Sequence, residues 1–124
     1  MAKEPITPEK KIKALADDIR KEIAIWESHR LYGCQDPFFS DGENMYLIRN
    51  HIIYYKTQLQ ELCTKNNLPL PDEYYLPTPP EVPKNYFAPN SKYFQERSKR
   101  YMADGRLIST AVPPPYKFDT QELF

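Results

Sequence analysis

The stretch that decides the fold is DGENMYLIRNHIIYYKTQLQELCTK, residues 41–65. Apolar side chains recur in it at intervals of three and four residues: Met45, Ile48, Ile52, Tyr55, Leu59 and Leu62. At 100° per residue these positions fall within an arc of roughly 100°, which is typical of a helix with one buried face. Ser40 and Glu43 have the S-x-x-E spacing of a capping box, so we expect the helix to begin there.

The first half of this helix carries apolar side chains on a second side as well, namely Tyr46, Leu47, Ile53 and Tyr54. A helix that is apolar on several sides is normally covered on more than one of them. One neighbouring helix covers only one side, so the second side requires either the C-terminal half of the chain or another subunit. Because exposed apolar patches usually mark interfaces, we expect a homo-oligomer with Tyr46, Ile53 and Tyr54 near the contact.

Upstream, the sequence predicts a second long helix over residues 8–32. The sequence Thr7-Pro8-Glu9 is typical of a helix start, and Gly33 is a natural stop. The apolar stripe of this helix consists of Ile12, Leu15, Ala16, Ile19, Ile23 and Trp26. Only about eight residues separate the two helices, which favours an antiparallel pair. We expect Phe38 and Phe39 in this loop to plug the helix junction.

Downstream, residues 68–90 contain seven prolines. Proline fixes φ and removes a hydrogen-bond donor, so this segment is expected to be extended. Its leucines, tyrosines and Phe87 distinguish it from a disordered linker, which is poor in aromatic residues. We therefore interpret it as an ordered strap laid over the second long helix.

The rest of the chain predicts a shorter third helix over residues 92–103, capped by Asn90-Ser91. An extended tail is expected over residues 106–124, in which residues 106–112 favour a short strand. The predicted fold is therefore mainly α: an antiparallel helical hairpin with a proline-rich extended strap and a shorter third helix. Its length is that of a single domain, residues 1–124.

The overall composition narrows the function classes. Lys plus Arg and Asp plus Glu both number 17, so the formal net charge is zero. A neutral chain argues against a dedicated nucleic-acid or membrane binder, because such binding requires a basic excess. No run approaches the roughly 20 apolar residues of a membrane span, and the N-terminus has no apolar signal segment. We expect a cytoplasmic protein.

The histidines and cysteines, which are the candidates for metal binding or nucleophilic catalysis, do not converge on one site. His51 and Cys63 lie on one predicted helix, about 18 Å apart along its axis, whereas zinc ligands lie within about 2.3 Å of one ion. Cys34 follows the C-terminal end of a helix, where the dipole disfavours a thiolate. We find no nucleophile, phosphate-loop or metalloprotease motif. The sequence predicts no catalytic residue, no metal site and no cofactor, and we expect a protein that is not an enzyme.

Two groups of residues are candidates for binding. The first lies in the crowded half of the helix at residues 41–65 and consists of Tyr46, Arg49, Asn50, Ile53 and Tyr54. The second is the most basic segment, residues 92–106, where basic and aromatic side chains alternate: Lys92, Tyr93, Arg97, Lys99, Arg100, Tyr101 and Arg106. Such a mixture binds phosphates and stacks on bases. The competing interpretation is an ordinary amphipathic helix with a solvated charged face.

Four stretches carry a resemblance. They are GCQDPF at residues 33–38, DGENMYLIRNHIIYYK at 41–56, LP at 70–71 and YYLPTPPEVP at 74–83. Together they resemble small uncharacterised proteins of phages and integrated elements in Gram-positive gut bacteria, over about residues 20 to 90. The resemblance implies a bacterial or phage cytoplasm and a small accessory role, such as antagonism of a host defence system.

Two function hypotheses follow. The first is a small non-enzymatic binding or accessory protein of phage or mobile-element origin, with a protein partner and with self-association. The alternative is a nucleic-acid or nucleotide-binding protein that uses residues 92–106. Retention on a phosphate column and its salt dependence distinguish the two.

Overall fold

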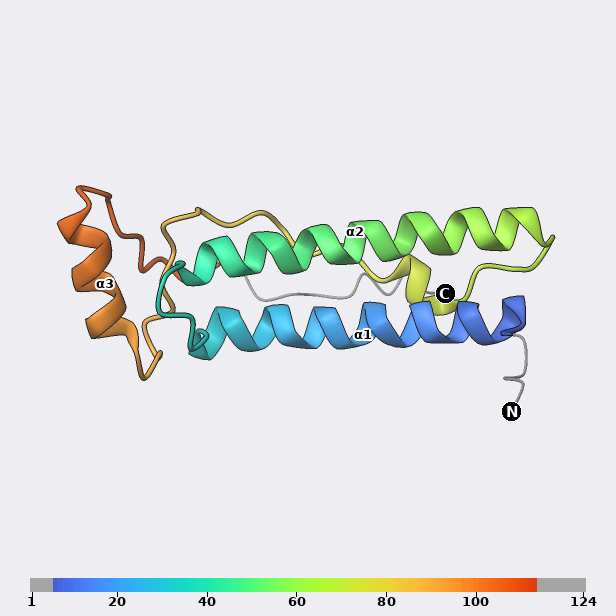
Figure 1. Cartoon of the computed structure of the whole chain (residues 1–124), viewed down its shortest axis with the longest axis horizontal. Coiled ribbons are helices and arrows are strands. Elements are labelled where there is room, and N and C mark those ends of the chain that lie inside the picture. The colour runs from blue at the N-terminus through green and yellow to red at the C-terminus, as the bar shows by residue number, and fades with distance from the viewer. Residues whose placement is uncertain (1–5, 114–124) are drawn as a thin grey trace, which may run out of the picture.

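The computed structural model describes residues 6–113. Its main feature is a pair of long helices, α1 (Pro8–Tyr32) and α2 (Asp41–Lys65), which lie side by side and antiparallel (Figure 1). A short 3-10 helix, η1 (Asp72–Tyr75), and a third helix, α3 (Phe94–Ala103), follow. The mainly α fold and the helical hairpin are as the sequence predicts.

Local capping explains where the long helices begin and end. The Thr7 hydroxyl accepts the Lys10 N–H at 3.2 Å, and the Ser40 hydroxyl accepts the Glu43 N–H at 3.0 Å. At the other end of α1, Gly33 has φ of 74° and donates its N–H to the His29 carbonyl at 2.9 Å. Positive φ at this position suits glycine, which lacks a Cβ.

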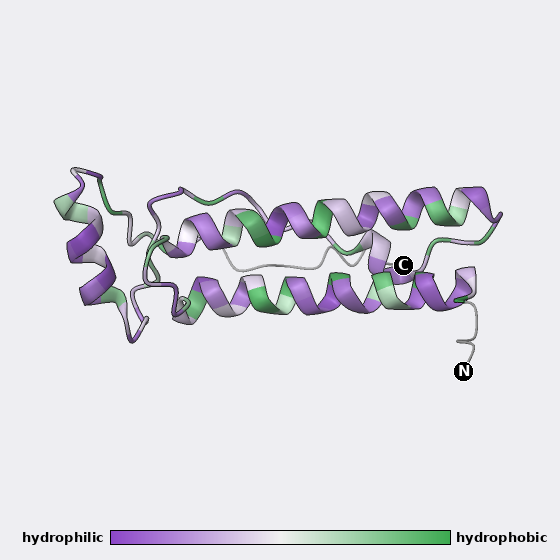
Figure 2. Ribbon diagram, in the orientation of Figure 1, coloured by the Kyte–Doolittle hydropathy of each residue, from purple (hydrophilic) through white to green (hydrophobic). Residues whose placement is uncertain are grey.

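The core lies between the facing stripes of α1 and α2. Trp26, Ile19, Met45, Ile52 and Leu59 are fully buried there. Figure 2 shows the apolar positions recurring in bands along both helices, as their three- and four-residue spacing requires. Burying an aliphatic side chain of this size contributes roughly 1.5–3 kcal/mol, so the two stripes are the main source of stability.

The loop between the helices differs from the prediction. Phe38 and Phe39 are exposed and do not plug the junction. The Asp36 carboxylate accepts the N–H groups of Phe38 and Phe39 at 2.8 and 3.2 Å, and the resulting turn leaves both rings outside. Burial opposes ionisation of Asp36, but these bonds and one from the Asn44 amide outweigh it and lower its pKa.

The proline-rich strap, residues 68–90, is ordered and packs on the hairpin. Leu76, Pro79, Tyr86, Phe87 and Ala88 are buried. Lys56 of α2 donates to the Leu76 carbonyl and to the Thr78 hydroxyl. Gly42 donates its N–H to the Tyr86 carbonyl at 2.9 Å, and a Cβ at Gly42 would overlap the Pro83 carbonyl oxygen. Glycine at this position therefore allows the strap to pass close to the backbone of α2.

The C-terminal part differs from the prediction at two points. The third helix begins at Phe94 rather than at residue 92, because Ser91 uses its hydroxyl and its carbonyl in a turn that precedes the helix. Residues 106–112 form no strand; they contribute one isolated parallel bridge, between Ser109 and Tyr86. The expected tail lies outside the described residues beyond residue 113.

No described helix combines the length and the apolar character needed to cross a membrane.

Candidate functional site

The outer face of α2 is the most distinctive surface of the molecule. We define it as the five residues Tyr46, Leu47, Asn50, Ile53 and Tyr54. At 100° per residue they occupy an arc of roughly 120° that points away from the core stripe of the same helix. Their four large apolar side chains remain 39%, 54%, 39% and 59% exposed, respectively. α1 and the strap reach only the edges of this face and leave its four apolar side chains partly exposed.

Asn50 is the polar member of the outer face and lies at its centre. It is half-buried, and its side-chain amide forms no hydrogen bond with the described residues. Tyr46 lies at one edge, where the Lys84 ammonium is 5.1 Å from its ring centroid. A central amide within an apolar face provides both a donor and an acceptor to whatever covers it.

Arg49 was predicted to belong to this site, but its guanidinium is engaged within the chain. Its Nε donates to the Pro79 carbonyl at 2.8 Å, and its Nη1 lies 3.6 Å from Glu81. These contacts attach the strap to α2. Arg49 is therefore a positioning residue for the strap and does not belong to the outer face.

A groove between α1 and α2 adjoins the outer face at Tyr54. It has a volume of about 390 Å³ and is lined by Lys11, Ala14, Leu15, Asp18, Tyr54, Tyr55, Gln58 and Leu62. Burial raises the pKa of Tyr55, and the nearby carboxylates of Asp18 and Glu22 raise it further, so its hydroxyl is a neutral hydrogen-bonding group. The groove extends the apolar character of the outer face toward α1.

The basic segment at residues 92–106 is divided between surface and interior. Lys92, Lys99, Arg100 and Arg106 are exposed, and Tyr93 is half-buried. Arg100 donates to the Pro37 carbonyl at 2.6 Å, and Arg106 lies 3.5 Å from Glu43 and over the Tyr101 ring. The two lysines are the exposed basic side chains of this segment that make no such contact.

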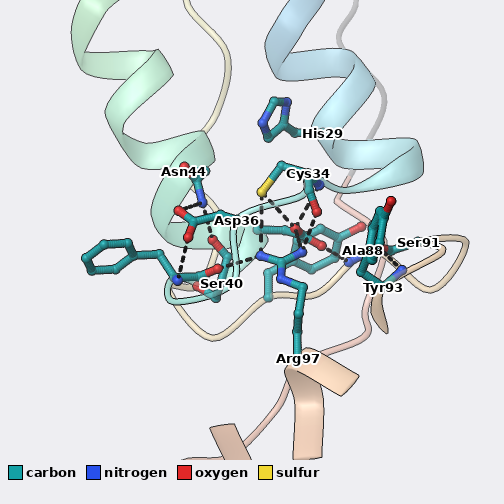
Figure 3. Close-up of polar contacts among 12 residues, drawn as sticks. His29, Cys34, Asp36, Ser40, Asn44, Ala88, Ser91, Tyr93 and Arg97 are labelled. Atoms are coloured by element: carbon teal, nitrogen blue, oxygen red, sulfur yellow. Dashed lines mark hydrogen bonds and ion pairs between the residues drawn. The ribbon is translucent and has the colours of Figure 1, made fainter. Parts of the chain in front are cut away.

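Arg97 is buried, in contrast to the exposed placement that phosphate binding requires, and Tyr101 is buried on the same helix. Arg97 forms an ion pair with Asp41, the first residue of α2, whose side chain is inaccessible to solvent. Figure 3 shows Arg97 reaching from α3 toward Cys34. Asp41 also accepts the N–H groups of Cys34 and Ala88 at 3.1 and 2.8 Å. This buried pair joins four parts of the chain: the loop, α2, the strap and α3.

The sequence contains a signal for this buried pair that was missed. Tyr93, Arg97 and Tyr101 recur at intervals of four, so Arg97 occupies the middle of the apolar stripe of α3. A charged residue at such a position is normally paired when buried. Its partner, Asp41, lies between the two residues of the S-x-x-E spacing, and no local signal distinguishes it.

The Cys34 thiol lies at this junction. Burial is the main cause that raises the pKa of the Cys34 thiol, whose sulfur lies 3.4 Å from the Asp41 carboxylate. A thiol with a raised pKa is a poor nucleophile at neutral pH. Cys34 and Cys63 are free cysteines, and residues 6–113 contain no group of three His, Cys, Asp or Glu side chains arranged to hold a metal ion.

Comparisons with protein-family models, with curated proteins and with solved structures found no match.

Proposed function

We propose that this chain is a small non-enzymatic protein that acts by binding a protein partner through the outer face of α2. The observation that carries the proposal is the exposure of Tyr46, Leu47, Ile53 and Tyr54 on a helix whose opposite side is in the core. A 25-residue helix fixed along its length by α1 and the strap presents these side chains on a rigid support. Rigid aromatic and aliphatic anchors lower the entropic cost of association.

The exposed apolar area of the outer face is large enough to support binding. Each of the four side chains is about half exposed, and side chains of this size have roughly 200 Å² of surface. About 400 Å² is therefore accessible, which corresponds to about 10 kcal/mol at 25 cal/mol per Å². Only the part of this figure that remains after the entropic cost of association, roughly 4–15 kcal/mol, contributes to affinity.

The resemblance to small phage and mobile-element proteins supports an accessory role for this binding. Antagonism of a host defence system is one such role, since it requires a binding surface and no catalysis. A cytoplasmic location in a bacterium is part of the same proposal.

A photoreactive amino acid placed at Leu47 tests the proposal. Irradiation in a bacterial lysate should yield discrete adducts with protein. The matched control carries the same group at Leu107, which is 83% exposed but lies outside the outer face. Because both positions are exposed, neither substitution should change the melting curve. Equal adduct patterns at the two positions would contradict the proposal.

A second candidate function is binding of nucleic acid or a nucleotide by residues 92–106. The exposure of Lys92 and Lys99, together with half-buried Tyr93, supports it. The burial of Arg97 leaves fewer cations for phosphates than the sequence suggested, so this function ranks second. The protein would be retained on phosphocellulose at low salt, and a double substitution of both lysines by Ala would lower the salt needed for elution. Passage of the wild-type protein through the column without retention would exclude this function.

A further inference from the structure

The order of residue types on the outer face of α2 is symmetric about its centre. Along the helix its order is Tyr46-Leu47, then Asn50, then Ile53-Tyr54. Aromatic and aliphatic residues thus lie at equal distances on the two sides of a central amide, at positions ±3 and ±4. A palindromic order on a helix is self-complementary when a second copy approaches in the antiparallel direction, which is the arrangement that a two-fold axis perpendicular to the helix produces.

We infer that the partner of the outer face is a second copy of this chain, packed antiparallel with the two-fold axis at Asn50. The inference rests on the proposed function and names the partner. Tyr46 of one copy then lies opposite Tyr54 of the other, and Leu47 lies opposite Ile53. The aromatic pair and the aliphatic pair are each formed twice, once on each side of the axis.

The central amide favours this arrangement over a different partner. Asn50 has no side-chain hydrogen bond to the described residues, and it is the residue that meets its own copy on the axis. A side-chain amide is both donor and acceptor, so two copies satisfy each other across a two-fold axis. An amide within an otherwise apolar helix contact also fixes the register of the two helices.

The charge pattern is compatible with self-association. None of the five residues of the outer face is charged, so the two copies bring no like charges into direct opposition at the axis. Depletion of charge at the centre with aromatic enrichment is the composition that distinguishes the core of an interface. The ammonium of Lys84, 5.1 Å from the Tyr46 ring, lies at the rim.

The area is sufficient for a dimer. About 400 Å² of apolar side chain per copy gives roughly 800 Å² from the two copies together. Interfaces are roughly 60% apolar by area, so the expected total is about 1,300 Å². This value lies at the lower end of the 1,200–2,000 Å² range of stable interfaces. We therefore expect reversible dimerisation in the micromolar range.

Disulfide cross-linking tests the geometry. The substitution Asn50→Cys places thiols next to the axis, where oxidation with copper phenanthroline should cross-link two copies. The control Thr57→Cys lies on the same exposed side, seven residues from the axis. Two copies of this residue would be about 21 Å apart along the helices, which is too far for a disulfide. Both variants also carry Ser in place of Cys34 and Ala in place of Cys63.

Cross-linking of Asn50→Cys without cross-linking of Thr57→Cys is the expected result. Cross-linking at both positions would mean a parallel pair and would overturn the antiparallel arrangement about Asn50. The absence of cross-linking at both positions, with a mass of 14.7 kDa by light scattering up to about 200 μM, would overturn the dimer.

The substitution Ile53→Asp tests whether the outer face itself carries the association. It should weaken dimerisation by at least about 100-fold, because it removes an apolar contact and adds a charge twice per dimer. The control Leu107→Asp should leave dimerisation unchanged. Both variants should keep the circular-dichroism spectrum of the wild type, since both positions are exposed. Unchanged dimerisation of Ile53→Asp would overturn the inference.

This inference and the proposed function fail in different ways. A protein that is monomeric at all concentrations, but is cross-linked to another protein from Leu47 in the lysate, refutes the dimer and leaves the proposed function intact. A monomer with no adduct specific to Leu47 refutes both.

Discussion

The substitution Arg97→Met should destabilise the protein by about 3 kcal/mol. The guanidinium pairs with an Asp41 carboxylate that is fully buried, and it also donates to the carbonyls of Cys34 and Phe39. Removing one member of a buried ion pair costs about 3–5 kcal/mol, because the other charge is left without its partner. Asp41 keeps two backbone N–H bonds and the favourable end of the α2 dipole, which places the expected loss at the lower end of this range.

Urea unfolding followed by circular dichroism measures this loss directly. For a chain of 124 residues, about 3 kcal/mol corresponds to a decrease in Tm of about 12 °C. The matched control is Lys99→Met, which removes an exposed cation from the same helix and should change the free energy of unfolding by less than about 0.5 kcal/mol.

A double-mutant cycle then separates the ion pair from other contacts of Arg97. The double variant with Asp41→Asn and Arg97→Met should be more stable than the sum of the single losses predicts, by at least about 1 kcal/mol. A loss below about 1 kcal/mol for Arg97→Met, or additive losses in the cycle, would refute the argument that this pair fixes α3 to the hairpin.

The remaining predictions concern the core, the strap and the thiol. Ile52→Asp should abolish the cooperative melt, because it places an unpaired charge between the two long helices; a melt like that of the wild type would refute their pairing. Gly42→Ala should lower the free energy of unfolding by about 1–3 kcal/mol, since its Cβ overlaps the Pro83 carbonyl. Mild trypsin or chymotrypsin treatment should leave residues 68–90 intact while the protein is folded, and early cleavage there would mean that the strap is only a linker. Alkylation of Cys34 by iodoacetamide should be slower than in the urea-unfolded chain and should accelerate as pH rises toward its raised pKa; equal rates in both states would contradict its burial.

The parts of the fold that local signals determine could be predicted from the sequence. The start of α2 follows from Ser40, the end of α1 from Gly33, and the facing stripes from three- and four-residue spacing. Each of these signals acts within about one helical turn, so it is visible in a short window of residues. The packing of the strap on the hairpin could also be predicted, because its aromatic residues require burial.

The parts that depend on distant contacts could not be predicted in the same way. The exposure of Phe38 results from an Asp36 turn and from the occupation of the junction by residues far along the chain. The pair of Asp41 and Arg97 joins residues that are 56 positions apart, and no periodicity relates them. The S-x-x-E spacing predicts the Ser40 cap correctly, but it does not predict the contact of Glu43. The Glu43 carboxylate accepts the hydroxyl of the distant Tyr101 at 2.8 Å.

In the candidate site, too, local signals could be predicted from the sequence and distant contacts could not. The outer face of α2 was predicted as an apolar second side, because helical periodicity alone identifies it. Arg49 lies beside that face, but its guanidinium contacts the Pro79 carbonyl and lies 3.6 Å from Glu81, so it is engaged within the chain.

The position of the Arg97 ion pair also has a consequence for the order of folding. The hairpin is complete within the first 65 residues, whereas the groups that cover its junction, from Leu76 to Arg97, are synthesised later. A hairpin with a short loop closes rapidly, and contacts of large sequence separation form slowly. During translation the nascent hairpin therefore exposes its junction until α3 has left the ribosome, and a chain that stops before Arg97 retains an Asp41 carboxylate without its cation.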